Sequence, residues 1–352
     1  MNLASLPFSA INLADPFFDS LKADYKEFAD WFAKKSADGS SVYVSHAENS
    51  VNGFLYLKRE SEAVSDVEPQ LQALPRIKVG TFKVDAHGTR LGERFMKKLF
   101  DHAMDLGVEE AYVTVFPRHG ALIELLRRYG FKQAAVKRTH NGDELVLVRS
   151  FQTFSSDIVL DYPFFSTAGR NFAMLGIYPN WHTRLFPDSK LHNEPPNIVR
   201  DVSHTNSIHK VYLCAMEGVL GLKHGDVLLI YRTKDKNSSA PAHYTAVVTS
   251  VCVVEEVRQL RSFASVDEFI RYADPYSVFT KAELEDLWKT KRYPNVIRFT
   301  YNAAFKHRVT RAELLEQVGI PADAYSGFQS LTLPQLRHIL ALGKVHENLA
   351  ID

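Results

Sequence analysis

The sequence predicts a mixed α+β protein of two domains: an α/β-type mixed sheet flanked by helices, then a small β-barrel with helical insertions. A chain of 352 residues is long for a single domain. Strand-like and helix-like stretches alternate up to about residue 150. After residue 200, short β-rich segments are separated by turns and interrupted by helical stretches. We therefore expect domains at 1–150 and 200–352, joined by a segment at 151–199 rich in proline and aromatic residues.

The first domain is organised around residues 77–106, which read as strand, turn and helix. Residues 78–84 are rich in β-formers, and the turn at 85–92 contains two glycines. Apolar side chains then recur at helical spacing: Leu91, Phe95, Leu99. A helix N-terminus offers free N–H groups and a favourable dipole, and Gly88 leaves room for a diphosphate. This element predicts an anion site.

The other elements of the first domain follow from local patterns. A helix is expected after Asp15-Pro16, because proline suits the first helical turn. Its stripe of Phe17, Leu21, Tyr25, Phe28, Trp31 and Phe32 predicts core packing. The remaining elements are expected in this order: a hairpin at 42–57, a solvated acidic loop at 61–72, a strand at 110–116, a helix at 120–131 and a strand at 144–148.

Composition limits the classes of partner and compartment. The formal net charge of +1 gives no general attraction to nucleic acid or membranes. Cys214 and Cys252 lie in apolar runs without the spacing of a zinc or disulfide framework, so we expect buried thiols and no metal. No apolar run reaches membrane-spanning length and the N-terminus lacks a signal-peptide pattern, which predicts a cytoplasmic protein.

Two motifs in the first domain resemble the GNAT superfamily of N-acetyltransferases. The run His87-Gly88-Thr89-Arg90-Leu91-Gly92 resembles its pyrophosphate loop, Gln/Arg-x-x-Gly-x-Gly/Ala, with Gly92 at the last position. His87 stands at the Gln/Arg position and Arg90 replaces the middle glycine. The run Gly120–Phe131 resembles the superfamily's final helix, which closes with Leu-Tyr-x-x-x-Gly-Phe.

The resemblance implies acetyl-CoA as co-substrate. It implies that the main chain of Phe82 and Val84 pairs with the pantetheine arm. It also implies that the loop holds the diphosphate through these residues: His87, Gly88, Thr89, Arg90, Leu91, Gly92.

The resemblance does not identify the catalytic groups. Leu126 stands where many members of the superfamily carry a tyrosine that protonates the thiolate. The candidate catalytic residues are Asp85, His119 and Tyr129. Each also has a structural interpretation: Asp85 as a turn or cap residue, His119 as a loop residue, Tyr129 in packing. A non-catalytic acyl-CoA binder therefore stays open.

The second domain resembles PUA-like modules of the ASCH/EVE type over roughly residues 200–345. Leu222-Lys223-His224-Gly225-Asp226 lies between two strands, and the next strand at 246–257 ends in Glu255-Glu256-Val257. Strands are expected at 211–216, 227–232, 244–257 and 296–301, and helices at 265–272, 281–289, 311–318 and 334–342.

The PUA-like resemblance implies binding of RNA or modified nucleobases. The candidate nucleic-acid-binding residues are Trp181, Asn206, Ser207, Lys210 and Arg232. Residues 288–311 interleave cations with aromatic side chains, which suits either a phosphate-and-stacking surface or a solvated face neutralised by nearby acids. His209 and Lys210 could also serve acid–base chemistry, although no complete catalytic set is visible.

Together these features predict an acetyl-CoA-dependent N-acyltransferase whose acceptor is an RNA or bears a nucleotide. Two alternatives stay open: a non-catalytic, acyl-CoA-sensing nucleic-acid-binding regulator, and a protein or small-amine acetyltransferase whose second domain mediates assembly.

Overall fold

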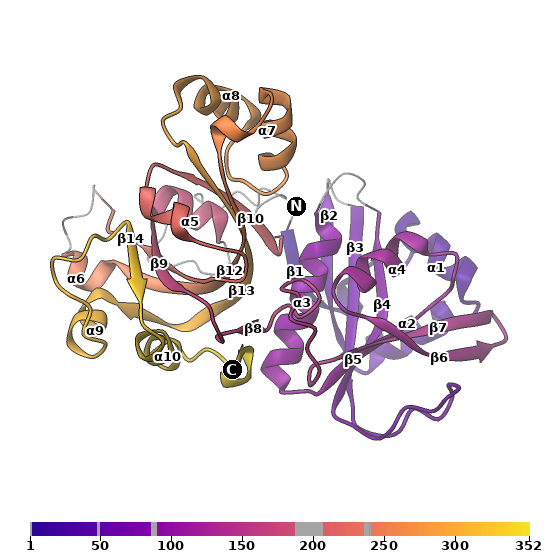
Figure 1. The fold of residues 1–352 in the computed structure, drawn as a ribbon. Helices are drawn as coiled ribbons and strands as arrows, with labels where there is room; N and C mark the ends of the chain where they lie inside the picture. Colours follow the sequence, from indigo (N-terminus) through magenta and orange to yellow (C-terminus); the bar gives the residue numbers. More distant parts are fainter. Residues whose placement is uncertain (1, 48–49, 86–89, 187–206, 236–238, 240) are drawn as a thin grey trace. The chain divides into compact units, whose positions relative to one another are not determined.

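A computed structural model describes residues 2–47, 50–85, 90–186, 207–235, 239 and 241–352. The chain divides into two compact units, Met1–Ser155 and Ser156–Asp352 (Figure 1). Both units combine a mixed sheet with helices, so the predicted α+β class is confirmed. In the described part of the chain, no helix is both long and apolar enough to span a membrane.

The first unit is a seven-stranded sheet in the order β1-β2-β3-β4-β5-β7-β6. Its strands are β1 (Asn2–Pro7), β2 (Ser41–Ala47), β3 (Ser50–Glu60), β4 (Arg76–Val84), β5 (Glu110–Val115), β6 (Lys132–Thr139) and β7 (Gly142–Ser150). Its helices are α1 (Asp19–Asp24), α2 (Phe28–Ala37), α3 (Leu91–Leu106) and α4 (Gly120–Arg128). The pair β4/β5 is parallel and the other pairs are antiparallel.

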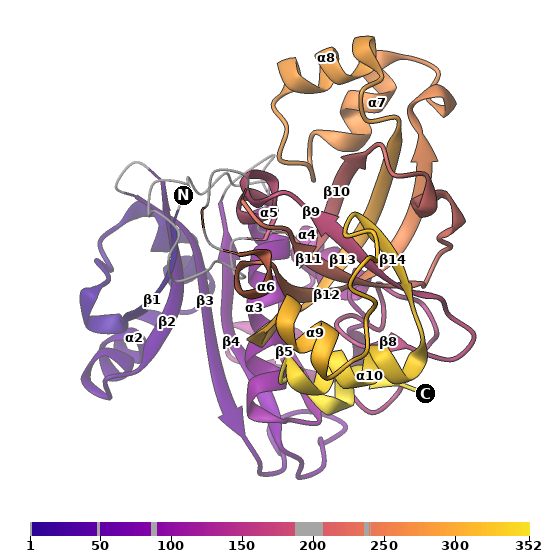
Figure 2. The same cartoon turned by 90° about the vertical axis from the view of Figure 1, so that its left-hand side faces the viewer.

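Helices cover both faces of this sheet (Figure 2). On one face, α2 packs Phe28 and Phe32 against Phe54 of β3 in an aromatic core. On the other face, α3 places Phe95 against Phe82 of β4, with ring centroids 5.8 Å apart. The single helix predicted after Asp15-Pro16 is instead divided into a 3-10 turn at Pro16–Phe18, α1 and α2. Half of the predicted stripe is core (Phe17, Phe28, Phe32), and the other half is partly buried against it (Leu21, Tyr25, Trp31).

The second unit is a six-stranded sheet in the order β10-β13-β12-β11-β9-β14. Its strands are β9 (Phe172–Ile177), β10 (His209–Cys214), β11 (Val227–Arg232), β12 (Val247–Gln259), β13 (Asn295–Thr310) and β14 (Phe328–Leu331), with β8 (Phe165–Ser166) and β15 (Ala350–Ile351) in a separate pair. Its helices are α5 (Pro179–Leu185), α6 (Ala242–Thr245), α7 (Val266–Ala273), α8 (Lys281–Thr290), α9 (Arg311–Glu316) and α10 (Leu333–Leu342). Helices α7 and α8 are inserted between β12 and β13 and pack together (Figure 1).

The described strands of the second unit form an open sheet where the sequence predicts a small barrel. The sheet ends at β10 and β14, and these two strands do not pair with each other. Strand β9 widens this sheet, because it pairs in parallel with β11 and antiparallel with β14. All six residues of β9 are buried. This strand belongs to the segment 151–199 that the sequence suggests as a connector. The two cysteines are buried free thiols, as expected.

Candidate active site in the first unit

Strands β4 and β5 separate part of the way along their length. They pair only between Arg76–Val79 and Glu110–Val113, whereas β4 continues to Val84 and β5 to Val115. The edge of β4 that faces β5 therefore has no strand partner beyond Val79, although its residues up to Asp85 are all described. Main-chain N–H and C=O groups on such an edge can pair with an extended ligand.

A β-bulge at Gly80 sets which side chains of β4 point toward the same face. Val79 lies opposite Leu57 and Thr81 opposite Tyr56, so Gly80 is the extra residue. Because of this extra residue, the side chains of Thr81 and Tyr56 lie on the same face of the sheet. A Cβ at Gly80 would lie 2.7 Å from Cδ1 of Tyr56, so only glycine fits there without moving the ring.

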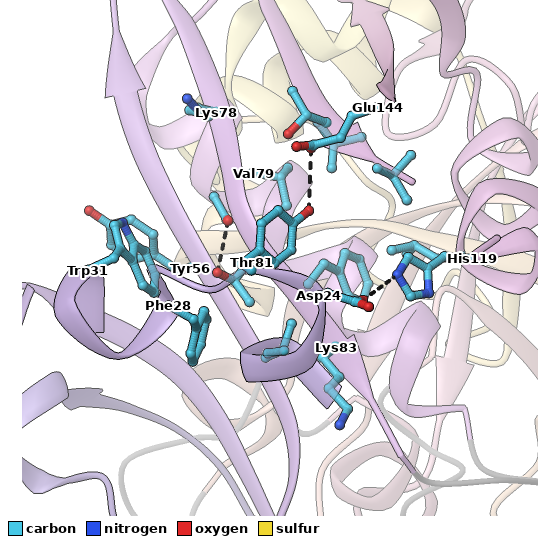
Figure 3. Close-up of a pocket in the computed structure, with 18 of the residues that line it drawn as sticks. Asp24, Phe28, Trp31, Tyr56, Lys78, Val79, Thr81, Lys83, His119 and Glu144 are labelled. Atoms are coloured by element: carbon cyan, nitrogen blue, oxygen red, sulfur yellow. Dashed lines mark hydrogen bonds and ion pairs between the residues drawn. The ribbon is translucent and has the colours of Figure 1, made fainter. Parts of the chain in front are cut away.

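A cavity of about 830 Å³ opens where the two strands separate (Figure 3). Its wall includes residues 78–85 of β4 and its end, 113–115 of β5, and 118–122 at the start of α4. Side chains of α1 and α2 also line it, among them Phe28 and Trp31. This volume lies within the range typical of small-molecule sites.

Glu144 is the most buried carboxylate of this cavity. It lies on β7, is almost fully buried, and accepts a hydrogen bond of 3.4 Å at Oε2 from the Tyr25 hydroxyl (Figure 3). Burial, followed by the Glu144 charge, raises the pKa of Tyr25 well above its ordinary value. At neutral pH the Tyr25 hydroxyl therefore keeps its proton and acts as the donor in this pair.

A second acid–base pair lies at the start of α4. His119 Nε2 is 2.9 Å from Oδ2 of Asp24, and Arg118 contacts Oδ1 of the same carboxylate at 2.7 Å. His119 and Asp24 both line the cavity (Figure 3). The Asp24 carboxylate thus orients the imidazole at the cavity wall.

The other two catalytic candidates lie in different environments. Asp85 lines the cavity, with its half-exposed carboxylate 3.1 Å from Nζ of Lys83. Tyr129 is fully buried beside Phe100, with ring centroids 6.3 Å apart, and is not part of the cavity wall. The fold thus brings Asp85 and His119 to one cavity and leaves Tyr129 in the core.

The predicted cofactor loop is described only in part. His87, Gly88 and Thr89 lie outside the described residues. Arg90 precedes α3 and pairs with Glu93 at 3.6 Å. Leu91 is buried in the core, and a Cβ at Gly92 would lie 3.0 Å from Cδ2 of Leu125, so this glycine lets α4 pack close to α3.

Phe82 and Val84 lie on the separated part of β4, where their main-chain groups border the cavity.

The candidate nucleic-acid residues of the second unit are mostly interior. Ser207 and Lys210 are fully buried, and Nζ of Lys210 lies within 5.9 Å of the Phe186 ring centroid. Arg232 is also buried. Trp181 is partly buried and lines a second cavity, and Asn206 lies outside the described residues.

Sequence reasoning missed Glu144, Tyr25 as its partner, and Asp24. One signal was available for Glu144. It alternates with Val146 and Val148 on β7, so a carboxylate occupies an inward-facing position of an apolar strand. Among the described residues, no group of three His, Cys, Asp or Glu side chains could hold a metal ion.

Comparisons with known proteins gave structural likeness only. No family model and no curated protein matches the chain. Among solved structures, the chain is similar to a mutant form of the ZmASCH protein from Zymomonas mobilis, with 10% identity over 49% of this chain and 96% of that chain and a TM-score of 0.32.

Two acetyltransferase structures are similar to about two fifths of the chain. One is a probable GNAT-family acetyltransferase from Chromobacterium violaceum, with 20% identity over 42% of this chain and 86% of that chain and a TM-score of 0.31. The other is a GNAT-family acetyltransferase from Elizabethkingia anophelis with acetyl-CoA bound. It shares 13% identity over 42% of this chain and 98% of that chain, with a TM-score of 0.29. At these scores the likeness alone assigns neither unit to a family.

Proposed function

We propose that the first unit binds acetyl-CoA between β4 and β5 and transfers its acetyl group to an amine, and that the acceptor is an RNA or bears a nucleotide. The observation that carries the proposal is the separation of β4 from β5 directly into a cavity that contains a buried carboxylate. The unpaired edge of β4 suits an amide-containing arm such as pantetheine, because it can add to the sheet as a further strand would. The loop at 87–92 would hold the diphosphate at the N-terminus of α3.

In this proposal the amine attacks the thioester carbonyl directly. A C–N bond forms, the C–S bond breaks, and CoA leaves as a thiolate that takes up a proton. Glu144 accepts the proton of the attacking nitrogen, and the Tyr25 hydroxyl holds the carboxylate in place. His119, oriented by Asp24, and Asp85 are the other candidate bases, and the buried Tyr129 has no part in the chemistry.

Many cationic side chains of the cavity wall could contact an anionic acceptor, and two of them, Lys35 and Lys137, pair with Asp38 and Asp66 outside the wall. Seven cationic side chains line it: Lys34, Lys35, Lys58, Lys78, Lys83, Arg118 and Lys137. Five carboxylates line it: Asp24, Glu27, Glu60, Asp85 and Glu144. Trp31 and Tyr56 add aromatic surface between these charges, as expected for phosphate contacts combined with stacking.

Release of free CoA thiol from acetyl-CoA tests the proposal, with single-stranded RNA, mononucleotides, peptides and small amines offered as acceptors. We expect release with RNA or nucleotide amines. Release with peptides or small amines alone would favour the protein or small-amine acetyltransferase. Binding of acetyl-CoA without release from any acceptor would favour the acyl-CoA sensor.

A further inference from the structure

The second unit contains a cavity of its own, which the transfer chemistry leaves unused. It has a volume of about 720 Å³ and is formed by the ends of β9, β10 and β11, by α6 and by residues 324–327. Neither Ser207, Lys210 nor Arg232 contributes to its wall. Of the described residues that the sequence suggested for nucleic-acid binding, only Trp181 lines this cavity.

Aromatic side chains dominate this wall. Six of them contribute: Tyr178, Trp181, Tyr212, Tyr231, Tyr293 and Tyr325. Tyr325 is 67% exposed and Tyr178 is 48% exposed, so broad ring surfaces face solvent. Burial raises the pKa of Tyr212, and the neighbouring Cys214, Tyr293, Tyr178 and Tyr325 raise it further. Flat walls bearing hydroxyls suit a planar, polar ring.

Two glycines in the cavity wall let the chain approach β9 closely. The N–H of Gly176 donates to the carbonyl of Gly327 at 2.7 Å. A Cβ at Gly176 would collide with the Ser326 carbonyl, and a Cβ at Gly327 would lie 2.5 Å from the Tyr325 ring. A hydrogen bond thus joins β9 to the segment that carries Tyr325, and this segment lines the cavity.

The charged side chains of the wall favour an anionic ligand over a cationic one. Arg311 and Lys234 line the cavity, and among its described wall residues there is no Asp or Glu. Arg311 donates to the carbonyl of Ala322 at 2.6 Å. An aromatic cage without carboxylates disfavours a cationic ligand, which such cages otherwise attract. A phosphate can be paired by the fixed guanidinium.

We infer that this aromatic cavity is a nucleotide site, in which the base stacks on the tyrosine and tryptophan rings and the phosphate pairs with Arg311 and Lys234. Its volume lies within the range of small-molecule sites. The inference rests on the proposed function only for the chemical class of the ligand, and it adds a nucleotide site in the second unit to the one proposed in the first. The ligand is either a free nucleotide or one unit of a single strand, and both share this chemistry.

Calorimetric titration of the full chain with AMP, adenosine and a five-residue oligoadenylate, all without acetyl-CoA, tests the site. Tyr325→Ala is the test variant and Tyr244→Ala its matched control, because both tyrosines are 67% exposed and only Tyr325 lines the cavity. We expect AMP to bind, and Tyr325→Ala to weaken AMP about tenfold or more while Tyr244→Ala leaves it unchanged. Arg311→Gln should weaken AMP and leave adenosine unaffected, with Arg337→Gln as its exposed control.

The inference is overturned if neither AMP nor the oligonucleotide binds, if the two tyrosine variants behave alike, or if adenosine binds as tightly as AMP. Tighter, salt-dependent binding of the oligonucleotide identifies a single strand as the source, and equal binding identifies the free nucleotide; both support the site. The titration contains no acyl donor, so its outcome does not depend on acetyl transfer. If the nucleotide binds but the separate assay with acetyl-CoA shows no release of CoA, the inference stands and only the proposed function is removed.

Discussion

At the scale of single residues, the candidate site depends on one carboxylate that the fold has removed from water, that of Glu144. Glu144 and Tyr25 are 119 positions apart in sequence, and only the sheet register and the position of α1 bring them to 3.4 Å. Burying a carboxylate is unfavourable unless hydrogen bonds compensate for the lost hydration. Carboxylates that are buried in a cavity are therefore candidates for a functional role. Its location in the cavity where β4 and β5 separate makes Glu144 the first residue to test.

Glu144→Gln keeps the shape of the side chain and removes the proton acceptor. We expect the turnover number for acetyl transfer to fall by about 10²- to 10⁴-fold, the range for loss of a general base, while the affinity for acetyl-CoA is retained. Steady-state kinetics and calorimetry measure the two quantities. Asp143→Asn, an exposed neighbour on the same strand, is the control. Unchanged turnover in Glu144→Gln would remove this carboxylate from the mechanism.

His182 gives a residue-scale prediction for the second unit. It is fully buried and 2.8 Å from Oγ1 of Thr249, and burial together with Arg232 and Arg308 lowers its pKa to about 3. Between pH 6.5 and 3 the unfolded chain therefore binds a proton that the folded chain does not. The free energy of unfolding falls as the pH falls through this window, by at most about 1.4 kcal/mol per pH unit.

Denaturant unfolding of the second unit between about pH 6.5 and 4 tests this linkage. His182→Gln should make the free energy of unfolding less dependent on pH across this window. His338→Gln changes an exposed histidine and should leave the wild-type dependence unaltered. Equal pH dependence in the wild-type chain and in His182→Gln would contradict the assignment.

At the scale of elements, β4 determines the site. The sequence predicts this strand and α3 correctly, because β-formers and a helical apolar face give local signals there. Local patterns reveal neither the bulge nor the separation from β5, since both depend on which residues of neighbouring strands pair. The separation is implied only by the resemblance to GNAT acetyltransferases, in which the central strand splays from its neighbour. For the same reason β9 is not evident as an interior strand: its partners β11 and β14 lie far along the chain, beginning at Val227 and Phe328.

Gly80→Ala tests the bulge. The added Cβ would lie 2.7 Å from the Tyr56 ring, which Phe8 and Trp31 hold in place at centroid distances of 5.2 and 5.6 Å. We expect the free energy of unfolding of the first unit to fall by about 1–3 kcal/mol, as in other overpacked sites, together with weaker acetyl-CoA binding. Urea unfolding measures the loss. Gly120→Ala, with no heavy atom within 4 Å of the added Cβ, should be nearly neutral. Equal stability of the two variants would argue against a fixed bulge.

At the scale of the whole molecule, two units with separate sheets predict separate folding. The second unit begins at Ser156, and its sheet includes β9. A fragment of residues 156–352 should therefore unfold cooperatively. A fragment of residues 200–352, which lacks β9, should not, because the edges of β11 and β14 would lose their shared partner.

Circular dichroism of the two fragments during thermal unfolding measures this difference. Each fragment is compared with the full chain under the same conditions. If residues 200–352 unfold as cooperatively as residues 156–352, then β9 is dispensable and the boundary of the folding unit lies after it.

The most direct test of the central claim is calorimetric titration of the full chain with acetyl-CoA. We predict binding of one molecule per chain. Ala121→Trp places a large ring on the exposed first turn of α4 within the cavity wall, and it should weaken binding about tenfold or more. Glu124→Trp adds the same ring on the same helix outside that wall and should bind as the wild type does. Absence of binding by the wild-type chain, or equal affinity of the two variants, would contradict a coenzyme A site between β4 and β5.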